Sequence, residues 1–238
     1  MTTTLITGAN KGLGFETARQ LIAAGHIVYL GSRDAGRGHA AVDSLGSPNA
    51  RFVQVDVTDE ASVGAAARAI EADGGLDVLV NNAGIEARTA DNGVIGAADL
   101  TADMMRRLFE TNVFGVVRVT HAFLPLLERS AAPVIVNVSS GLGSIATVTH
   151  PGTPAYGYPG VEYPASKTAV NMITVQYAKA LPRMRINAVE PGFTNTDLNG
   201  RTGIQTVEEG AEIIVRMAQA GPDGPTGGYF DRRGPIPW

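Results

Sequence analysis

The sequence predicts an α/β protein in which helices cover both faces of a doubly wound, mostly parallel sheet of about seven strands. Short apolar runs rich in β-branched residues alternate with longer stretches of helical character. Their continuous apolar character indicates strands buried on both faces, and the alternation with helices favours a parallel sheet. A length of 238 residues, without a composition shift or a Pro/Ser-rich linker, fits one domain over residues 1–238.

Seven strands are expected from these runs, and two helix boundaries follow from local signals. In chain order the strands are Thr3–Thr7, Ile27–Leu30, Phe52–Val55, Val78–Val80, Val134–Val138, Ile186–Val189 and a last one near Gly228–Phe230. The first helix should run through Ala24, because Gly25 is a typical helix terminator. Thr206–Glu209 has the form of a capping box, with Glu three residues after the N-cap Thr, and predicts a helix that ends at Gly221-Pro222.

The composition favours a compact soluble protein and excludes several functional classes. Hydrophobic residues make up 44% and charged residues 18% of the chain. The net charge of −4 and the pI of about 5.6 argue against a nucleic-acid partner. With no Cys and four scattered His, no disulfide, thiolate site or metal site is expected. No apolar run of membrane-spanning length and no signal segment occurs, so we expect a cytoplasmic protein without a membrane partner.

A glycine-containing turn joins the first strand to the first helix. It reads Thr7-Gly8-Ala9-Asn10-Lys11-Gly12-Leu13-Gly14. The three glycines allow a tight turn and let a pyrophosphate approach the backbone N–H groups at the positive end of the helix. Because both the preceding strand and the following helix are present, the pattern predicts a dinucleotide-binding Rossmann fold rather than an ordinary turn.

Tyr163 and Lys167 lie four residues apart in a stretch of helical character. Residues at this spacing share one face of a helix, so a phenol and an ammonium can meet one ligand together. A lysine charge favours the phenolate and is expected to lower the pKa of the tyrosine, which can then act as a general acid or base. Tyr156 and Tyr158 are alternatives, but neither has a Lys four residues later. Since Pro164 is tolerated only in a first turn, the helix should begin close to Tyr163.

The spacing of three residues between the first two glycines, rather than one, resembles that of the short-chain dehydrogenase/reductase family. Further matches to the family follow in its order along nearly the whole chain. They are Asp56-Val57, Asn81-Asn82-Ala83-Gly84, Asn112, Ser139-Ser140, Tyr163 with Lys167, and Pro191-Gly192. Within the family the chain is most similar to NADPH-dependent carbonyl reductases, through Asn10-Lys11-Gly12, Ser32-Arg33-Asp34, Arg37-Gly38, an enlarged loop before Tyr163 and Glu208–Ala211. The substrates of that subgroup are typically hydrophobic aldehydes, ketones and quinones.

The resemblance implies a catalytic set of Asn112, Ser140, Tyr163 and Lys167. In this scheme Tyr163 gives a proton to the carbonyl oxygen while a hydride arrives from nicotinamide, and Ser140 holds that oxygen. Lys167 lowers the pKa of Tyr163 and binds the nicotinamide ribose, and Asn112 retains a water that links Lys167 to solvent. Ser139 competes with Ser140, but the family more often uses the second serine, and alternation along a strand separates the two.

The resemblance also implies a cofactor site, and the residues favour NADP(H) over NAD(H). Ser32 stands where an NAD-selecting acid is usual, and Lys11, Arg33 and Arg37 can reach a 2′-phosphate. Asp34 is a rival ribose-binding acid, which we interpret as a helix N-cap. Asp56 is expected to accept from the adenine amine, with a backbone contact from Val57, and Thr194 and Thr196 are either ligands of the carboxamide or turn residues. The cofactor-binding residues that the resemblance implies are Gly8, Asn10, Lys11, Gly12, Leu13, Gly14, Ser32, Arg33, Arg37, Asp56, Val57, Asn82, Ala83, Gly84, Tyr163, Lys167, Pro191, Gly192, Thr194 and Thr196.

Two segments are expected to shape the substrate site. Residues 144–162 form an insertion relative to the short form of the family, and residues 197–206 form a substrate loop. Glu162 should lie near the substrate mouth, where it either favours cationic substrates or faces water. The insertion is modest, so both a monomer and a homo-oligomer remain open.

The leading hypothesis is an NADP(H)-dependent oxidoreductase that interconverts a small-molecule carbonyl and its alcohol. Two alternatives remain: a nucleotide-sensing regulator without turnover, and an isomerase, dehydratase or epimerase that uses bound nicotinamide transiently. A pure sensor would need no general acid, so the four catalytic residue types argue against it.

Overall fold

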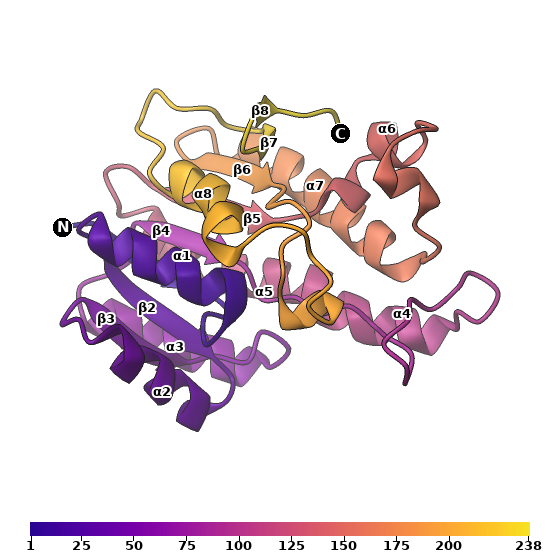
Figure 1. Ribbon diagram of the computed structural model, residues 1–238. Coiled ribbons are helices and arrows are strands. Elements are labelled where there is room, and N and C mark those ends of the chain that lie inside the picture. Colours follow the sequence, from indigo (N-terminus) through magenta and orange to yellow (C-terminus); the bar gives the residue numbers. More distant parts are fainter.

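The computed structural model describes residues 1–238 and contains one eight-stranded sheet with the strand order β3-β2-β1-β4-β5-β6-β7-β8 (Figure 1). The strands are β1 (Thr3–Ile6), β2 (Ile27–Ser32), β3 (Ala50–Gln54), β4 (Val78–Asn81), β5 (Val134–Val138), β6 (Arg185–Val189), β7 (Tyr229–Asp231) and β8 (Gly234–Pro235). All neighbouring pairs are parallel except β7 with β8. The predicted doubly wound α/β fold is therefore confirmed, and the additional strand is a two-residue antiparallel edge.

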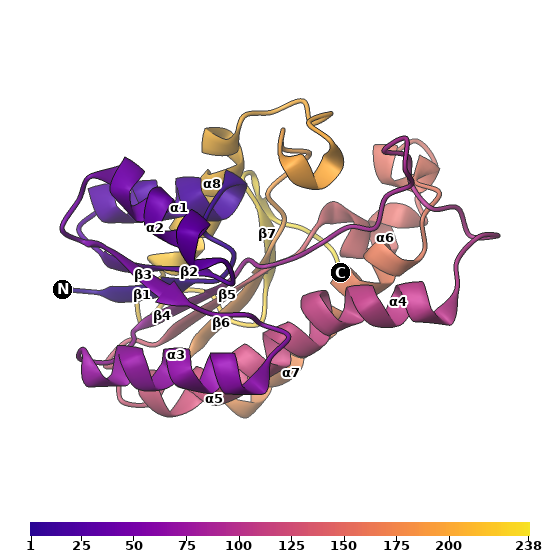
Figure 2. The ribbon, with the colours of Figure 1, turned by 90° about the horizontal axis from the view of Figure 1, so that it is seen from below.

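Helices cover both faces of the sheet, as Figure 2 shows. One layer consists of α1 (Gly12–Ala23), α2 (Ala35–Leu45) and α8 (Val207–Ala218), and the other of α3 (Glu60–Ala72), α5 (Gly115–Leu127) and α7 (Glu162–Ala180). The shorter helices are α4 (Ala102–Phe109), which a π-helical turn over Glu110–Phe114 joins to α5, and α6 (Ile145–Val148). Short 3₁₀ turns occur at Gly141–Gly143, Pro154–Gly157 and Asp197–Asn199. No helix is both long enough and apolar enough to span a membrane.

Local signals set the helix ends much as the sequence predicts. Gly25 follows the end of α1 with a φ of +89°. Thr206 and Glu209 form the reciprocal capping box at the start of α8, which confirms that prediction. Helix α7 begins at Glu162, so Pro164 lies in its first turn, where its missing N–H would have no helical partner.

Two hydrophobic clusters, one on each face, account for the continuous apolar character of the strands. Leu5 belongs to a cluster with Val119 and Phe123 of α5, whereas the next residue, Ile6, belongs to a cluster that includes Leu21 of α1. Successive strand residues point to opposite faces, so β1 needs apolar side chains at both positions. Burial on both faces leaves the ends of the strands as the place where polar side chains can gather.

A buried polar network crosses this apolar interior beneath the site. Asn81 and Asn137 are register partners on β4 and β5, and Asn81 Nδ2 donates to Asn137 Oδ1 at 2.8 Å and to Thr120 Oγ1 at 3.2 Å. Asn137 Nδ2 in turn donates to Thr174 Oγ1 at 2.9 Å. The network fixes α5 and α7 against the two central strands, because each buried polar group depends on the others for a partner.

Replacing Asn137 by Ala should reduce the free energy of unfolding by about 2 to 4 kcal/mol, since it removes two hydrogen bonds, leaves buried partners unpaired and opens a cavity. Urea unfolding monitored by circular dichroism measures the change. Asn195→Ala is the control, because that side chain is exposed. Equal stability of the two variants would contradict the network's contribution.

Candidate active site

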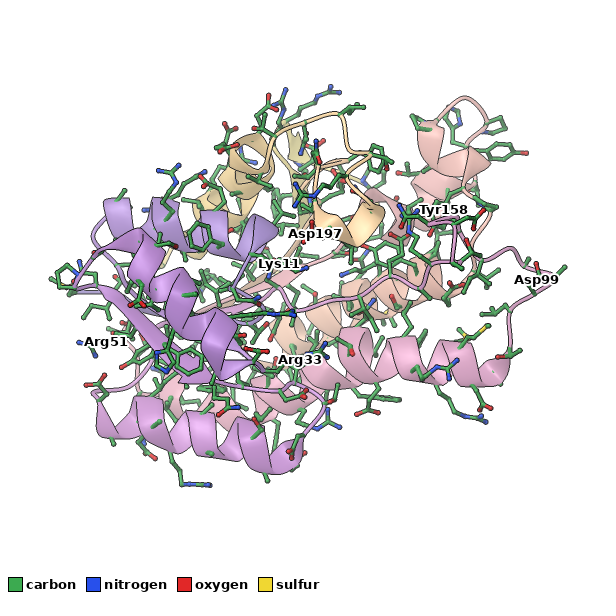
Figure 3. All side chains as sticks on the ribbon, turned by 60° about the horizontal axis from the view of Figure 1, so that its bottom comes forward. Lys11, Arg33, Arg51, Asp99, Tyr158 and Asp197 are labelled. Carbon is green, nitrogen blue, oxygen red and sulfur yellow. The ribbon has the colours of Figure 1, made fainter.

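One cleft of about 1540 Å³ lies at the carboxyl ends of the strands and collects most of the predicted site residues. Its position matches the point between β1 and β4 where the winding of the sheet reverses, the usual ligand site in open parallel sheets. The predicted residues that line the cleft are Gly8, Asn10, Lys11, Gly12, Leu13, Gly14, Ser32, Arg33, Arg37, Asp56, Val57, Asn82, Ala83, Gly84, Ser140, Tyr163, Lys167, Pro191, Gly192, Thr194 and Thr196. Figure 3 shows Lys11 and Asp197 close together above the sheet, with Tyr158 beyond them.

The glycine turn has the backbone geometry that a phosphate cradle requires. Gly8 and Gly12 have φ of +65° and +57°, in the left-handed region that favours glycine. A Cβ on Gly14 would lie 2.5 Å from Asn82 Nδ2 and 2.7 Å from the Gly8 carbonyl oxygen. Lys11, the N-cap residue of α1, makes no side-chain cap hydrogen bond, so no side chain of the cap covers the amides of the first turn. Uncapped amides at a helix N-terminus fit a pyrophosphate.

Asn82 holds the end of β4 against the glycine turn. Its Nδ2 donates to the carbonyl oxygens of Thr7 and Gly8 at 2.9 and 3.2 Å, and its backbone N–H donates to Thr7 Oγ1 at 3.0 Å. These bonds fix the width of the cleft at the strand ends. The Asn-Asn-Ala-Gly motif therefore connects two loops rather than capping a helix.

At the end of β2, beside the glycine turn, Ser32, Arg33, Asp34 and Arg37 lie together. The Asp34 carboxylate accepts from the Arg37 backbone N–H at 2.8 Å and forms the N-cap of α2, as predicted. Ser32 Oγ donates to the Asp34 carbonyl oxygen at 2.9 Å. Arg33 has no carboxylate partner, whereas the Arg37 guanidinium lies 3.9 Å from the Asp34 carboxylate. Arg33 is therefore the cation at this end that is free to meet an anion.

Lys11 is engaged with the predicted substrate loop. Its Nζ lies 2.8 Å from Asp197 Oδ2, and Arg201 binds the other oxygen of the same carboxylate at 2.9 Å. Hydrogen bonding to Lys11 holds the pKa of Asp197 below its usual range. Sequence reasoning places Lys11 with the 2′-phosphate cations, but here it joins the glycine turn to residues 197–206.

Asp56 combines a turn role with a place in the cleft. Its Oδ1 accepts from the backbone N–H of Thr58 at 2.9 Å and from the Thr58 hydroxyl at 2.7 Å. Burial raises the pKa of Asp56, but these hydrogen bonds and the charge of Arg33 outweigh it and keep the pKa below the usual value. The carboxylate is thus kept as an anionic acceptor.

Tyr163 and Lys167 lie on successive turns at the start of α7, and both are buried. Lys167 Nζ donates to the carbonyl oxygen of Val138 at 2.8 Å and lies 5.6 Å from the centroid of the Tyr163 ring. The bond to the end of β5 fixes the ammonium beside the phenol. The pair predicted from spacing is therefore brought together in the cleft.

The pKa of Tyr163 differs from the sequence expectation. Burial raises it, the Glu86 charge raises it further, and the nearby Ser140 hydroxyl acts in the opposite direction without reversing the shift. Burial also lowers the pKa of Lys167 to about 8. Desolvation acts against the charged form of each group, so it outweighs the expected effect of the lysine charge on the phenol.

The two serines after β5 both line the cleft but differ in burial. Ser139 is buried, and its hydroxyl donates to Asn171 Oδ1 at 2.6 Å. Ser140 lines the cleft, and its Oγ accepts from the Leu142 N–H at 3.3 Å. Ser140 is thus the more exposed of the two serines in the cleft.

Asn112 is the one predicted site residue that does not line the cleft. It lies in the π-helical turn, where its Oδ1 accepts from the Ile85 N–H at 2.8 Å. Its Nδ2 donates to the Ile85 carbonyl oxygen at 2.9 Å and to Ser166 Oγ at 3.1 Å. Asn112 therefore joins the segment after β4 to α7, and π-helical turns of this kind are frequent at functional sites.

The segment after β6 encloses Thr194. Gln205 Nε2 donates to Thr194 Oγ1 at 2.8 Å, and the Thr194 hydroxyl bonds the Gly192 carbonyl oxygen at 3.1 Å. Thr194 is buried, so the turn-residue alternative describes its hydroxyl better than a free ligand does. Thr196 is less buried, and its methyl group lies 3.7 Å from the Cβ position of Gly12.

Glu162 is not at the substrate mouth and does not face water, so both expectations for it are wrong. Its side chain is fully buried in the first turn of α7, and neither carboxylate oxygen has a hydrogen-bond partner. The local sequence shows that Glu162 lies in a first turn, but it does not show which face of that turn the rest of the protein covers, and so it does not reveal that Glu162 is buried.

The sequence does not predict that Glu86, Arg88 and Tyr158 lie together in the wall of the cleft. Arg88 Nη2 lies 2.7 Å from Glu86 Oε2, and the Tyr158 hydroxyl donates to Glu86 Oε1 at 2.6 Å. The only local signal was the position of Glu86 two residues after the Asn-Asn-Ala-Gly motif. The contact with Tyr158 spans more than seventy residues of sequence, and no short pattern encodes it.

The sheet, the glycine turn at its switch point and the buried Tyr–Lys pair define a dinucleotide-binding α/β protein. Residues 2–206 match the family model for short chain dehydrogenase, and the chain belongs to the short-chain dehydrogenase/reductase family. It is therefore an oxidoreductase.

Individual relatives cover nearly the whole chain. The (+)-neomenthol dehydrogenase of Capsicum annuum is 31% identical, with 96% of this chain and 95% of that protein covered. Salutaridine reductase of Papaver somniferum is 32% identical over 95% of this chain and 93% of that protein, and its solved structure superimposes with a TM-score of 0.84 over 97% and 99% of the two chains. The solved NADPH-bound carbonyl reductase from chicken fatty liver gives a TM-score of 0.86 at 27% identity, with 100% of this chain and 99% of that chain covered. The chain thus resembles carbonyl reductases of the family.

Replacing Lys167 by Met should reveal a pH-dependent difference in stability. The pKa of Lys167 falls from 10.5 to about 8 on folding, so between these values the unfolded chain binds a proton that the folded chain does not. The wild type should therefore gain about 2 to 3 kcal/mol of unfolding free energy over the variant between about pH 7 and about pH 10.

Urea unfolding at a series of pH values measures this difference. Lys179→Met is the matched control, because Lys179 is exposed near the end of the same helix, and its difference from the wild type should stay constant. A constant difference for Lys167→Met as well would contradict a buried ammonium.

Proposed function

We propose that the chain is an NADP(H)-dependent oxidoreductase that interconverts a carbonyl compound and its alcohol. The observation that carries the proposal is the burial of Tyr163 beside Lys167 and Ser140 in the same cleft as the glycine turn. A general acid, an oxygen-binding hydroxyl and a dinucleotide cradle in one cleft are the parts that hydride transfer to a carbonyl requires.

The residues of the cleft fit a nicotinamide dinucleotide. The uncapped amides of α1 would hold the pyrophosphate, Asp56 would bind the adenine end, and Tyr163 and Lys167 lie where the nicotinamide end would enter. When bound, the cofactor supplies or accepts the hydride.

Proton transfer belongs to the side chains of the protein. Burial keeps the Tyr163 hydroxyl protonated, which suits donation to a carbonyl oxygen, and the Ser140 hydroxyl would hold that oxygen in line with the phenol. Lys167, with its pKa of about 8 and its Nζ 5.6 Å from the centroid of the Tyr163 ring, would resupply the proton, since it gains and loses one near neutral pH. Asn112 positions α7 against the segment after β4 and would keep the supply route in place.

The cationic end of the cleft supports a preference for NADP(H). Arg33 has no carboxylate partner and lies beside Ser32, which brings no negative charge. A guanidinium can bind the 2′-phosphate through several N–H groups at once.

Exposed apolar side chains at the mouth of the cleft favour a hydrophobic substrate. Ile85, Phe193, Leu198 and Ile204 all line it with exposed side chains, and Ile204 is 90% exposed. An apolar ligand that covers these side chains removes their surface from water.

Tyr163→Phe should lower kcat for ketone reduction by about 100-fold to 10,000-fold, because the ring stays in place while the transferable proton is lost. NADPH oxidation followed by absorbance, with a panel of aldehydes, ketones and quinones, measures the change, and NADPH affinity should be nearly unaltered. Tyr177→Phe on the same helix is the control. Unchanged turnover in Tyr163→Phe would refute the assignment, and tight NADPH binding without turnover of any compound would favour a sensor.

Arg33→Ala should weaken NADPH binding by about 10-fold or more while NADH binding changes little, since only the 2′-phosphate loses a charged partner. Fluorescence titration of both nucleotides measures the two affinities. Arg107→Ala is the control, because Arg107 is exposed on α4 and has no ion pair. Equal losses for both nucleotides would count against the preference for NADP(H).

A further inference from the structure

Glu86, Arg88 and Tyr158 form a second polar cluster in the cleft, which we call the Glu86 cluster. The Glu86 side chain is 5% exposed and the Arg88 side chain 20% exposed. One carboxylate oxygen of Glu86 accepts from Tyr158 and the other from Arg88, at 2.6 and 2.7 Å. All three residues line the cleft that contains Tyr163.

The Glu86 cluster lies close to the reacting end of the cleft. A Cβ at Gly84, two residues before Glu86, would lie 3.6 Å from Lys167 Nζ, so the chain that carries Glu86 leaves β4 beside Lys167. Ile85, the residue between them, exchanges two hydrogen bonds with Asn112, whose Nδ2 also donates to Ser166 on α7. In agreement with this geometry, the pKa of Tyr163, which burial raises, is raised further by the charge of Glu86. A substrate group next to the carbonyl, or across a small ring from it, can therefore meet the cluster.

The cluster has acceptor capacity left for a ligand. A carboxylate accepts about four hydrogen bonds, and Glu86 receives two, while the Tyr158 oxygen keeps its lone pairs after donating its hydrogen. Arg88 neutralises the carboxylate, so the cluster as a whole carries no excess negative charge. Acceptors without net charge favour a neutral O–H donor over a cation.

Contacts among three loops fix the position of the Glu86 cluster. Arg88 pairs with Val94 as a β-bridge, and a Cβ at Gly160 would lie 2.8 Å from Val94 Cγ1, so the insertion packs tightly on this hairpin. At the tip of the hairpin, Asn92 lies against Gly200 of the loop 197–206. A polar group held this firmly can discriminate between substrates, because it does not move away when an apolar ligand is bound.

We propose that Glu86 and Tyr158 form a specificity-determining pair that binds a hydroxyl group of the substrate, so that the preferred substrates are apolar ketones or aldehydes that carry a hydroxyl near the carbonyl. This proposal rests on the proposed carbonyl reduction. The apolar mouth binds the hydrocarbon body, Tyr163 and Ser140 take the carbonyl, and the Glu86 cluster accepts the hydroxyl hydrogen. A substrate that lacks the hydroxyl cannot use the acceptor sites that remain on Glu86 and Tyr158.

The test compares 2-hydroxycyclohexanone and 4-hydroxycyclohexanone with cyclohexanone, using NADPH and the full-length protein. The kcat/KM of the wild type should favour at least one hydroxyketone by about 10-fold, and in both Glu86→Gln and Tyr158→Phe that ratio should fall toward 1. Tyr156→Phe, in the same loop but exposed, and Glu128→Gln on the far end of α5 should keep the wild-type ratio. No preference in the wild type, or a ratio unchanged in Glu86→Gln and Tyr158→Phe, would overturn the proposal.

A binding measurement separates this proposal from the proposed function. Calorimetric titration with cyclohexane-1,2-diol and with cyclohexanol requires no turnover, and the diol should bind about 10-fold more tightly to the wild type but not to Tyr158→Phe. If no ketone is reduced but the diol still binds more tightly than cyclohexanol, the result would count against carbonyl reduction and not against the hydroxyl site. Equal affinity of the wild type for the diol and for cyclohexanol would overturn the hydroxyl site. Thermal melting of each variant confirms that it is folded.

Discussion

The hydrogen bond from Lys167 to the carbonyl oxygen of Val138 is the contact on which the site depends. It joins the second turn of α7 to the carboxyl end of β5 and so places Tyr163, one turn earlier, above the cleft. The same junction leaves no room beside it, because a Cβ on Gly143 would lie 2.8 Å from the backbone carbon of Lys167. A second hydrogen bond, from Asn171 Nδ2 to the carbonyl oxygen of Gly143 at 3.0 Å, also holds α7 against the turn that follows β5. Ser140, Tyr163 and Lys167 thus have fixed positions before any ligand arrives.

This arrangement stabilises a geometry that is unfavourable by itself. A buried ammonium without a carboxylate partner is desolvated, and a single neutral carbonyl compensates it only in part. The buried carboxylate of Glu162, which has no partner, lies in the same first turns of α7. The apolar clusters on both faces of the sheet and the Asn81–Asn137 network offset these costs, because they hold the central strands where the polar groups require them. Function and stability therefore place opposite demands on the start of α7.

The sequence predicts the fold and the motif positions well, because both are encoded locally. Apolar runs buried on two faces, the glycines that need positive φ and the spacing of Tyr163 and Lys167 each leave a short pattern. The pKa of Tyr163, the burial of Glu162 and the pairing of Tyr158 with Glu86 arise from contacts between loops that are distant in sequence. Such contacts depend on how loops pack above the sheet, and residue type or spacing does not record them. Motifs thus predict which residues reach the cleft, but not the electrostatic environment they meet there.

Lys11 illustrates how such a contact changes the interpretation of a motif. In the glycine turn it is expected to meet a phosphate, yet it pairs with Asp197, which Arg201 also binds. A phosphate that binds Lys11 must compete with this carboxylate, so cofactor binding and the position of residues 197–206 are coupled through one ammonium. The same loop lies against Asn92, which belongs to the hairpin that positions Glu86. The glycine turn and the hairpin that carries Arg88 are thus joined through residues 197–206 by a continuous set of contacts.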